Sequence, residues 1–315
     1  MGNLIVSSSP HIRTKRTVQS IMRDVLIALL PATVAGVVLF GVKALVTILV
    51  CVATSVLSEF LFNLICKKKQ TIKDLSAAVT GLILALCLPT SVGIWHCIVG
   101  SVFAIIVVKC LFGGIGCNFA NPAATARVFL LIAFSTAVGG GVATNFSSPD
   151  LIASATPLEI IKYGGDATLP SLMDMLLGNR AGAIGETCIV ALLLGGIYLI
   201  ARKVIYWHTP AIYVGTVFVL SLLIKQDVTL ALYEVLGGGL VLAAFFMITD
   251  YVTTPINKLG KMIFALGCGI ITVLIRFWGS YPEGVSFAIL LMNILSPYIE
   301  KLCTKKPLGK AGKKA

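Results

Sequence analysis

Charged side chains are scarce in this sequence. Only 12% of the 315 residues are Asp, Glu, Lys or Arg, whereas 57% are hydrophobic. The mean hydropathy is +0.98. A soluble domain needs more charge than this to cover its surface. The composition therefore excludes a soluble globular domain and predicts an integral membrane protein with several spans.

Several common chemical motifs are missing as well. The nine cysteines contain no C-x-x-C pair, so neither a zinc site nor a ferredoxin-type cluster is expected. Three histidines without a carboxylate grouping predict no histidine-based metal site. No glycine-rich fingerprint opens a strand–helix unit, which excludes a nicotinamide site of that type. The N-terminus has no continuous apolar run before its basic cluster, so no cleavable signal peptide is expected.

Long apolar runs are what the sequence does contain. A transmembrane helix needs about 20 apolar residues, and we therefore expect an all-α integral membrane protein with about ten helices. The terminal segments are residues 1–23 and 301–315, a single transmembrane domain covers 24–300, and a long loop covers 139–182. The predicted spans are 24–42, 44–65, 75–92, 94–111, 121–138, 183–201, 209–224, 230–248, 260–277 and 284–300.

The net charge of +12 is concentrated at the ends of the apolar runs. Clusters such as HIRTKR near the N-terminus and TKKPLGKAGKK near the C-terminus are typical of topology signals, not of a groove for nucleic acid. The positive-inside rule places both termini in the cytoplasm and the 139–182 loop outside. The expected location is the cytoplasmic membrane of a bacterium or archaeon.

Three joints between spans do not resemble ordinary turns. They are FGGIGCNFANPAATAR (112–127), MITDYVTTPINKLGK (247–261) and RFWGSYPEGVSFAILLMN (276–293). Irregular backbone at membrane depth persists only where protein or water covers it, so such joints mark cofactor or ion sites. The alternative is that Gly, Asn and Pro simply end helices at the interface. Pro122 and Pro282 open the fifth and tenth spans, which suggests two inverted five-helix repeats.

Four carboxylates are candidates for an ion path. Glu59, Glu186 and Glu234 fall inside predicted spans, and Asp250 lies at a helix end within the second joint. A carboxylate in lipid is costly, so it usually faces a partner or a water-filled path. Glu59 is also near the lysines at 67–69, which leaves an interfacial position open.

One polar stretch, SSPDLIASATPLEII (147–161), places a threonine directly before a proline in the long loop. Pro157 disfavours helical backbone at Thr156 and predicts an extended conformation there. Small residues before Thr156 are expected to leave its hydroxyl accessible to a bulky reagent, and an acidic residue six positions upstream could help a modifying enzyme dock. Covalent modification is one interpretation; a simple solvated connection is the other.

The quoted joints carry a resemblance to a known family. GGIGCNFANPAATAR, FFMITDYVTTPINKLGK and YPEGVSFAILLMN are similar to the NqrB/RnfD family. Its RnfD-type members belong to Rnf-type ion-translocating electron transport complexes, and its NqrB-type members belong to the sodium-translocating NADH:quinone reductase. The resemblance covers nearly the whole chain.

The resemblance implies a covalently bound flavin. In the family a flavin transferase attaches FMN by a phosphoester to the threonine of D-x-x-[ST]-G-A-T. Asp150, Ala155 and Thr156 match this motif, whereas Ala153 replaces the usual Ser or Thr and Ser154 the usual Gly. The implied acceptor is Thr156, with Asp150, Ser154 and Ala155 as its neighbours. A second, non-covalent flavin (riboflavin) is also implied, and the three joints are the candidates for its site.

The resemblance further implies a membrane flavoprotein that relays electrons between ferredoxin and NAD within a larger complex, coupled to Na⁺ or H⁺ translocation. Iron–sulfur and flavin subunits are the expected partners, because this chain alone shows no ferredoxin or nicotinamide site. The residues themselves leave two rivals open: a stand-alone inverted-repeat channel or secondary transporter for a small solute, and a membrane scaffold without a cofactor.

Overall fold

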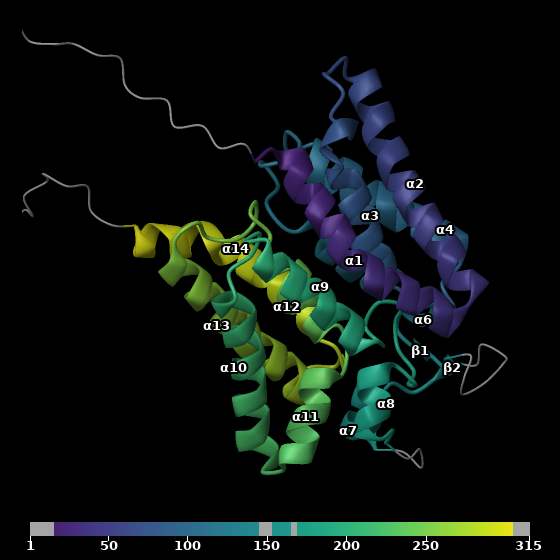
Figure 1. The fold of residues 1–315 in the computed structure, drawn as a ribbon, viewed down its shortest axis with the longest axis vertical. Helices are drawn as coiled ribbons and strands as arrows, with labels where there is room; N and C mark the ends of the chain where they lie inside the picture. Colours follow the sequence, from purple (N-terminus) through teal and green to yellow (C-terminus); the bar gives the residue numbers. More distant parts are fainter. Residues whose placement is uncertain (1–15, 145–152, 165–168, 305–315) are drawn as a thin grey trace, which may run out of the picture.

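The computed structural model describes residues 16–144, 153–164 and 169–304, and these residues are mainly helical (Figure 1). The first part forms α1 (Val18–Phe40), α2 (Val42–Ile65), the 3-10 helix η1 (Ile72–Asp74), α3 (Ser76–Leu86), α4 (Ile94–Val102), the π-helix η2 (Phe103–Cys110), α5 (Pro122–Ala133) and α6 (Ser135–Val138). The long loop forms the antiparallel strands β1 (Gly141–Val142) and β2 (Ala153–Ser154), α7 (Pro157–Tyr163) and α8 (Leu172–Leu177). The last part forms α9 (Ile189–Ala201), α10 (His208–Lys225), α11 (Val228–Leu236), α12 (Leu240–Phe246), α13 (Lys258–Trp278) and α14 (Val285–Cys303).

The predicted all-α membrane protein with irregular helix joints is confirmed. Among the described helices, five are long and apolar enough to cross a membrane: α1, α2, α10, α13 and α14. Helices α11 and α12 meet the same criterion only as a pair, which is bent by 56° at its break. Shorter apolar helices occupy the other four predicted ranges: α3, α4 with η2, α5 and α9. Half of the predicted spans are therefore short or broken.

Local chemistry explains where several of these elements begin and end. The Asn121 side chain caps α5 by accepting from the N–H groups of Ala123 (3.1 Å) and Ala124 (3.2 Å), and Pro122 occupies the first turn. The break between α11 and α12 falls on three consecutive glycines, of which Gly238 has φ of +64°. The cap at Asn121 and the proline after it show that the first joint ends where α5 begins, as the sequence predicts.

The two halves of the chain make matching internal contacts. In the first half, α2 packs on α3 and α4, α1 on α3, and α4 on α5. In the second half, α10 packs on α11, α12 and α13, α9 on α12, and α13 on α14. The counterparts α1 and α9 also touch each other, as do α5 and α14. The match is incomplete, since α1 also packs on α2, a contact that α9 and α10 do not repeat to the same extent. The duplication of a five-span unit and the inverted orientation of the two units stay predictions.

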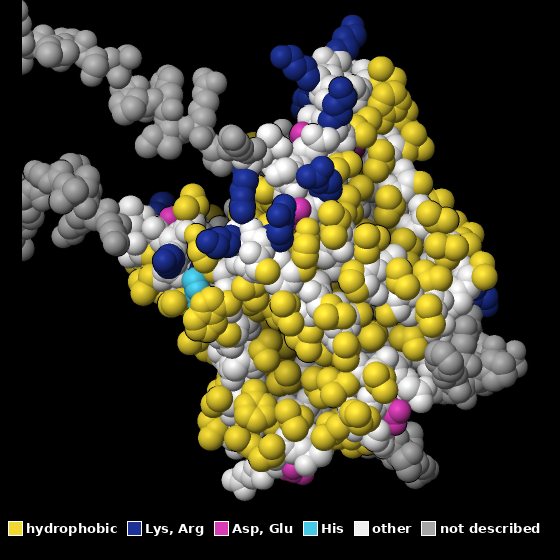
Figure 2. All heavy atoms as spheres, viewed as in Figure 1, with side chains coloured by type: hydrophobic (Ala, Val, Ile, Leu, Met, Phe, Trp, Pro, Cys, Tyr) yellow, Lys and Arg dark blue, Asp and Glu magenta, His cyan; other side chains and the backbone are white. Residues whose placement is uncertain are grey.

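Basic side chains are distributed unevenly over the surface. The first and last described residues lie on one side of the molecule, whereas α7 and α8 lie on the opposite side (Figure 1). Lys and Arg side chains gather along the border near the termini, and the face below them is largely hydrophobic (Figure 2). This asymmetry is the pattern that the positive-inside rule requires.

Glycine allows the two halves to approach closely where α1 meets α9. A Cβ atom at Gly195 would lie 2.1 Å from the carbonyl oxygen of Ala28. Small residues at such contacts let membrane helices pack through their backbones, where dispersion replaces the missing hydrophobic driving force. The α1–α9 contact therefore depends on the absence of a side chain at this one position.

Gly195→Ala is expected to lower the stability of the purified chain by about 1–3 kcal/mol. The added methyl group would clash with the backbone of α1, which cannot rotate away as a side chain can. Thermal unfolding in detergent measures the loss. Gly215→Ala in α10 is the control, since no described atom lies within 4 Å of that Cβ position. Equal melting temperatures for the two variants would contradict this account of the α1–α9 contact.

Candidate functional site

Thr156 is the N-cap residue of α7. Its backbone is extended, with φ −70° and ψ 154°, as the following proline predicts. The Thr156 hydroxyl oxygen accepts from the Glu159 N–H (3.3 Å), and the Thr156 N–H donates to the Glu159 carboxylate (2.7 Å). This is a capping box. The expectation of an openly accessible hydroxyl is wrong, because Thr156 is only 9% exposed.

The other motif residues are placed less fully. Ser154 ends β2, where it pairs with Gly141 across the two-stranded sheet. Ala155 is exposed, next to the capped threonine. Asp150 lies outside the described residues.

Thr156 lines a cavity of about 260 Å³, here called the Thr156 cavity. Its wall combines the α7 start with α5, the third joint and the segment before α9. Three carboxylates, one arginine and two tyrosines contribute to it. The lining residues are Pro89, Arg127, Leu131, Ser135, Val138, Gly139, Gly140, Thr156, Glu159, Tyr163, Ala183, Glu186, Ser280, Tyr281, Pro282 and Glu283.

An ion pair crosses the Thr156 cavity between the two halves of the chain. Arg127 from α5 donates to the carboxylate of Glu283, which precedes α14. Glu186 is also buried there, and its carboxylate accepts from the Ala183 N–H at 2.7 Å. Among the described residues Glu186 forms no ion pair within 4.0 Å. Of the three carboxylates that line the cavity, Glu283 is paired with Arg127, Glu159 is held by the Thr156 N–H, and Glu186 has no ion-pair partner among the described residues.

Helix α7 is fastened to the third joint. The Lys162 ammonium donates to the carbonyl oxygens of Gly279 and Tyr281, both at 2.7 Å, just beyond the end of α13. The Tyr163 hydroxyl donates to the Ser280 carbonyl at 2.5 Å. Partial burial lowers the pKa of Lys162 from its ordinary value. These bonds fix the helix that carries Thr156 relative to the membrane-spanning helices.

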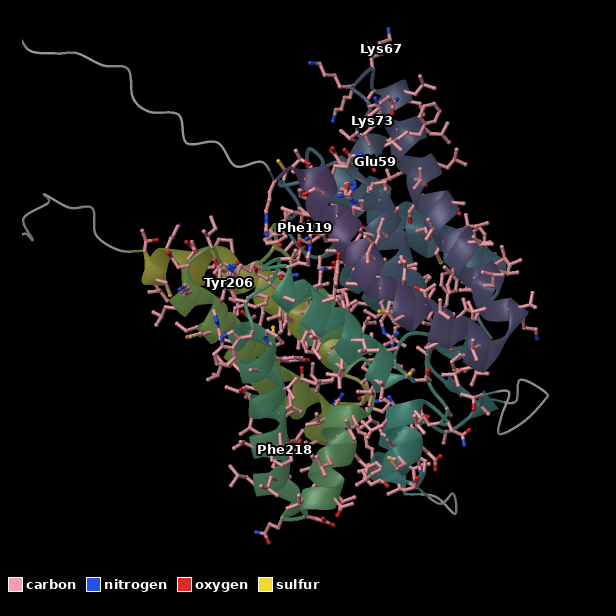
Figure 3. The ribbon with its side chains drawn as sticks, viewed as in Figure 1. Glu59, Lys67, Lys73, Phe119, Tyr206 and Phe218 are labelled. Carbon is pink, nitrogen blue, oxygen red and sulfur yellow. The ribbon has the colours of Figure 1, made fainter. Side chains whose placement is uncertain are left out.

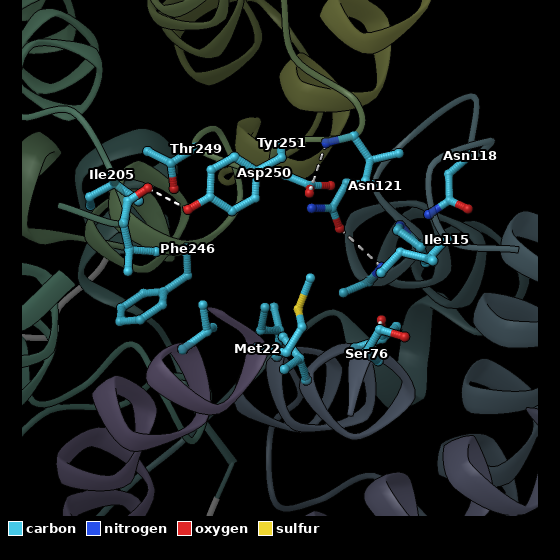
Figure 4. Close-up of a pocket in the computed structure, with 18 of the residues that line it drawn as sticks. Met22, Ser76, Ile115, Asn118, Asn121, Ile205, Phe246, Thr249, Asp250 and Tyr251 are labelled. Carbon is cyan, nitrogen blue, oxygen red and sulfur yellow. Dashed lines mark hydrogen bonds between the residues drawn. The ribbon is translucent and has the colours of Figure 1, made fainter. Parts of the chain in front are cut away.

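A second cavity, here called the Asp250 cavity, has a volume of about 90 Å³ (Figure 4). The first and second joints form much of its wall, together with α3 and the end of α12. The Asp250 carboxylate accepts from the Val252 N–H (3.3 Å) and the Thr253 hydroxyl (3.1 Å). The buried amide oxygen of Asn118 has no hydrogen-bond partner among the described residues. An unpartnered acceptor at a polar cavity indicates water or a polar ligand.

Asn293 of α14 ties the first two joints together. With its amide oriented to satisfy both ends, it accepts from the Asn121 N–H at 2.9 Å and donates to the Thr253 carbonyl at 3.2 Å. Residues of all three joints thus line cavities inside the protein or bond to one another. This supports the interpretation of the joints as covered sites over that of simple helix ends at the interface.

Two of the four predicted ion-path carboxylates are neutralised in buried ion pairs. Glu59 (labelled in Figure 3) accepts from the Lys109 ammonium at 2.9 Å and from Thr71, and Lys109 also donates to Ser76. Glu234 accepts from the Arg276 guanidinium at 3.2 Å. Glu59 is 2% exposed and paired, so it does not face lipid; its interfacial depth stays a prediction.

Sequence reasoning missed the basic members of the site. Lys109, Arg127 and Arg276 are not among the residues predicted for the site, yet all three side chains lie inside the protein. A signal was present: each interrupts an apolar stretch, IIVVKCLF, ATARVFLL and VLIRFWG. A lone basic residue in such a run usually faces a partner within the protein.

Lys109→Met is expected to destabilise the protein by about 3–5 kcal/mol, because it leaves the Glu59 carboxylate buried without its counter-charge. Adding Glu59→Gln to the same chain should restore most of the loss. Thermal unfolding of both variants in one detergent tests the expectation. If Lys109→Met alone unfolds at the wild-type temperature, the Lys109–Glu59 pair contributes nothing to stability.

Comparisons with known proteins match this chain to one family over nearly its full length. The model of the NQR2, RnfD, RnfE family matches residues 5–309. One subunit of the Na(+)-translocating ferredoxin:NAD(+) oxidoreductase complex of Acetobacterium woodii is 44% identical over 311 residues, covering 98% of this chain and 96% of the relative. The corresponding subunit of the proton-translocating ferredoxin:NAD(+) oxidoreductase complex of Clostridium ljungdahlii is 40% identical, covering 96% of each. That of the ion-translocating oxidoreductase complex of Stutzerimonas stutzeri is 36% identical, covering 94% and 93%.

Proposed function

Because the chain belongs to the NQR2, RnfD, RnfE family, we propose that it is the RnfD component of an Rnf-type complex that passes electrons between ferredoxin and NAD⁺ and couples this transfer to Na⁺ or H⁺ translocation. The observation that carries the proposal is the 44% identity over nearly the whole of both chains. It favours a complex subunit over a stand-alone channel, secondary transporter or scaffold. The complex resides in the cytoplasmic membrane, with both termini of this chain in the cytoplasm and the α7–α8 region outside.

We infer that FMN is attached to Thr156 by a flavin transferase and extends into the Thr156 cavity. The cavity's 260 Å³ is just below the range of about 300–1,000 Å³ typical of small-molecule sites, so it suits part of the group with the rest at the opening. Arg127, which is paired with Glu283, is the basic side chain in the lining that a phosphate would meet, and Tyr163 and Tyr281 supply aromatic rings. Bound flavin supplies reversible electron transfer; the chain supplies its position and electrostatic surroundings.

The capping box is compatible with an ester at Thr156. In the described residues the hydroxyl oxygen accepts one hydrogen bond, and its own proton makes none. Replacing that proton by a phosphoryl group therefore breaks no donor bond of the protein. The Glu159 carboxylate continues to hold the Thr156 N–H at the start of α7.

The second flavin does not fit the Asp250 cavity as the structure has it. A volume of about 90 Å³ holds a few water molecules, not a three-ring system. The riboflavin implied by the family resemblance stays a prediction, and no step of the mechanism is assigned to it here.

The geometry narrows the proposed ion path to Glu186 and Asp250. Glu59 and Glu234 are held in buried pairs, whereas Glu186 and Asp250 each line a cavity without an ion-pair partner among the described residues. Helix α5 connects the cavities: Asn121 lines the Asp250 cavity and Arg127 the Thr156 cavity. Six residues of α-helix rise only about 9 Å. A hydrated path between the cavities is therefore short.

Thr156→Ala is expected to abolish flavin fluorescence of the chain on a denaturing gel when the protein is made together with its flavin transferase. Thr156→Ser should retain part of it, since it keeps the hydroxyl. Ser154→Ala is the matched control and should fluoresce like the wild type. Fluorescence that persists in Thr156→Ala would place the flavin on another residue.

Glu186→Gln is expected to lower the number of ions moved per electron in vesicles that contain the complex, because it removes the one Thr156-cavity carboxylate that is deeply buried and unpaired. Ferredoxin:NAD⁺ electron transfer with an ionophore present should fall less than ion transport. Asp174→Asn, which removes a surface carboxylate of α8, is the control. An unchanged ion-to-electron ratio in Glu186→Gln would exclude this residue from the path.

A further inference from the structure

A large apolar groove runs along α10 on the outer surface of the protein. Its volume is about 600 Å³, and hydrophobic side chains line it almost completely. Leu193 of α9 and Phe245 of α12 form one wall, and Val214 and Phe218 of α10 form the other. Figure 2 shows this hollow within the hydrophobic face below the basic border. It shares the wall residue Phe245 with the Asp250 cavity and no lining residue with the Thr156 cavity.

The length of the groove matches one leaflet of a bilayer. Its lining extends from Trp207, just before α10, to Phe218, eleven residues further along. At 1.5 Å per residue this distance is about 16 Å, close to half of the roughly 30 Å hydrocarbon layer. Figure 3 labels Phe218 on α10 and Tyr206 near the other end of that helix. The groove therefore has the depth of a single acyl chain.

Aromatic and basic side chains surround the end of the groove at Trp207. Trp207 is 67% exposed, and a tryptophan with such exposure is typical of the membrane interface. The ammonium groups of Lys258 and Lys261 lie 5.9 and 5.0 Å from the centre of the Tyr206 ring. The imidazole of His208 stacks on the same ring, with the centroids 5.3 Å apart.

The carboxylate nearest this cluster in the C-terminal helix is already engaged. Glu300 accepts from the Ile256 N–H at 2.9 Å and from the Asn257 amide at 2.7 Å. Asp24, from α1, pairs with Arg202. No acidic side chain lines the groove among the described residues. Glu300 keeps its charge and acts on Lys261, but two ammonium groups face this one carboxylate, so the net charge at the mouth favours an anion.

We propose that this groove binds one anionic phospholipid, with an acyl chain between α10 and α12 and the phosphate headgroup beside Lys258 and Lys261. Basic side chains near the surface each contribute about 1 kcal/mol to binding an anionic lipid. The lipid would also cover one side of the broken α11–α12 span, whose residues Val235 and Val241 line the groove. This inference is independent of where the flavin is attached.

The chain offers two variants that separate the acyl and headgroup parts of the site. Gly215→Leu places a side chain in the groove that Gly215 lines, and its Cβ position has no atom within 4 Å apart from the neighbouring backbone of its own helix. Ala53→Leu places the same side chain on an exposed face of α2 and serves as the control. Lys258→Gln with Lys261→Gln removes the positive charge at the mouth.

The test is native mass spectrometry of the full-length chain and of the intact complex, after exchange into phosphatidylglycerol or phosphatidylcholine with identical acyl chains. The wild type and Ala53→Leu should retain phosphatidylglycerol preferentially. Gly215→Leu should retain at least about tenfold less lipid. The double lysine variant should lower the preference for phosphatidylglycerol by roughly thirtyfold, the ratio that corresponds to two contributions of about 1 kcal/mol.

Three results would overturn the proposal. Equal retention by Gly215→Leu and wild type would place the lipid elsewhere, and equal retention of both lipids by the wild type would exclude an anionic headgroup. In the intact complex, a cysteine at Val214 that cross-links to another subunit would show that a protein helix fills the groove. None of these results depends on flavin attachment at Thr156.

Discussion

The structure depends on one constraint: polar backbone that is exposed by a broken helix inside a membrane must find its hydrogen-bond partners within the protein. The break between α11 and α12 leaves carbonyl oxygens that a continuous helix would use. The Arg276 guanidinium donates to the carbonyls of Glu234 and, at 3.2 Å, of Gly237. Lys162 serves the end of α13 in the same way. Arg276 and Lys162 thus act as donors to irregular backbone.

The same constraint joins the two halves. Arg127 of the first half pairs with Glu283 of the second, and Asn293 of the second half accepts from the Asn121 N–H of the first. Both contacts lie at irregular joints, where free polar groups are available. The walls of the two cavities are therefore shared between the halves. A displacement of one half against the other must alter both cavities.

Much of the fold and part of the site could be predicted from local sequence. Apolar runs located the spans, and the pairing of Thr156 with Pro157 determined the extended backbone before α7. The burial of Thr156 could not be predicted, because residues 280–283, more than a hundred positions away, close its cavity. The ion pairs were hidden for the same reason: Lys109 lies 50 positions from Glu59, and Arg127 lies 156 positions from Glu283. Sequence shows which charges are costly in lipid, and only tertiary structure shows how each is compensated.

The charge around Thr156 gives the proposed function a physical basis for coupling. Glu159, Glu186 and Glu283 line the cavity, whereas Arg127 is the basic residue in its wall and is already paired with Glu283. A phosphoester at Thr156 would add further negative charge. An electron delivered beside these groups would raise their mutual repulsion, which is strong where water is scarce. The arrival of a cation relieves that repulsion, and the unpaired Glu186 is the group beside which it would do so. Electron transfer and cation movement would then be linked by charge balance, whether the cation is Na⁺ or H⁺.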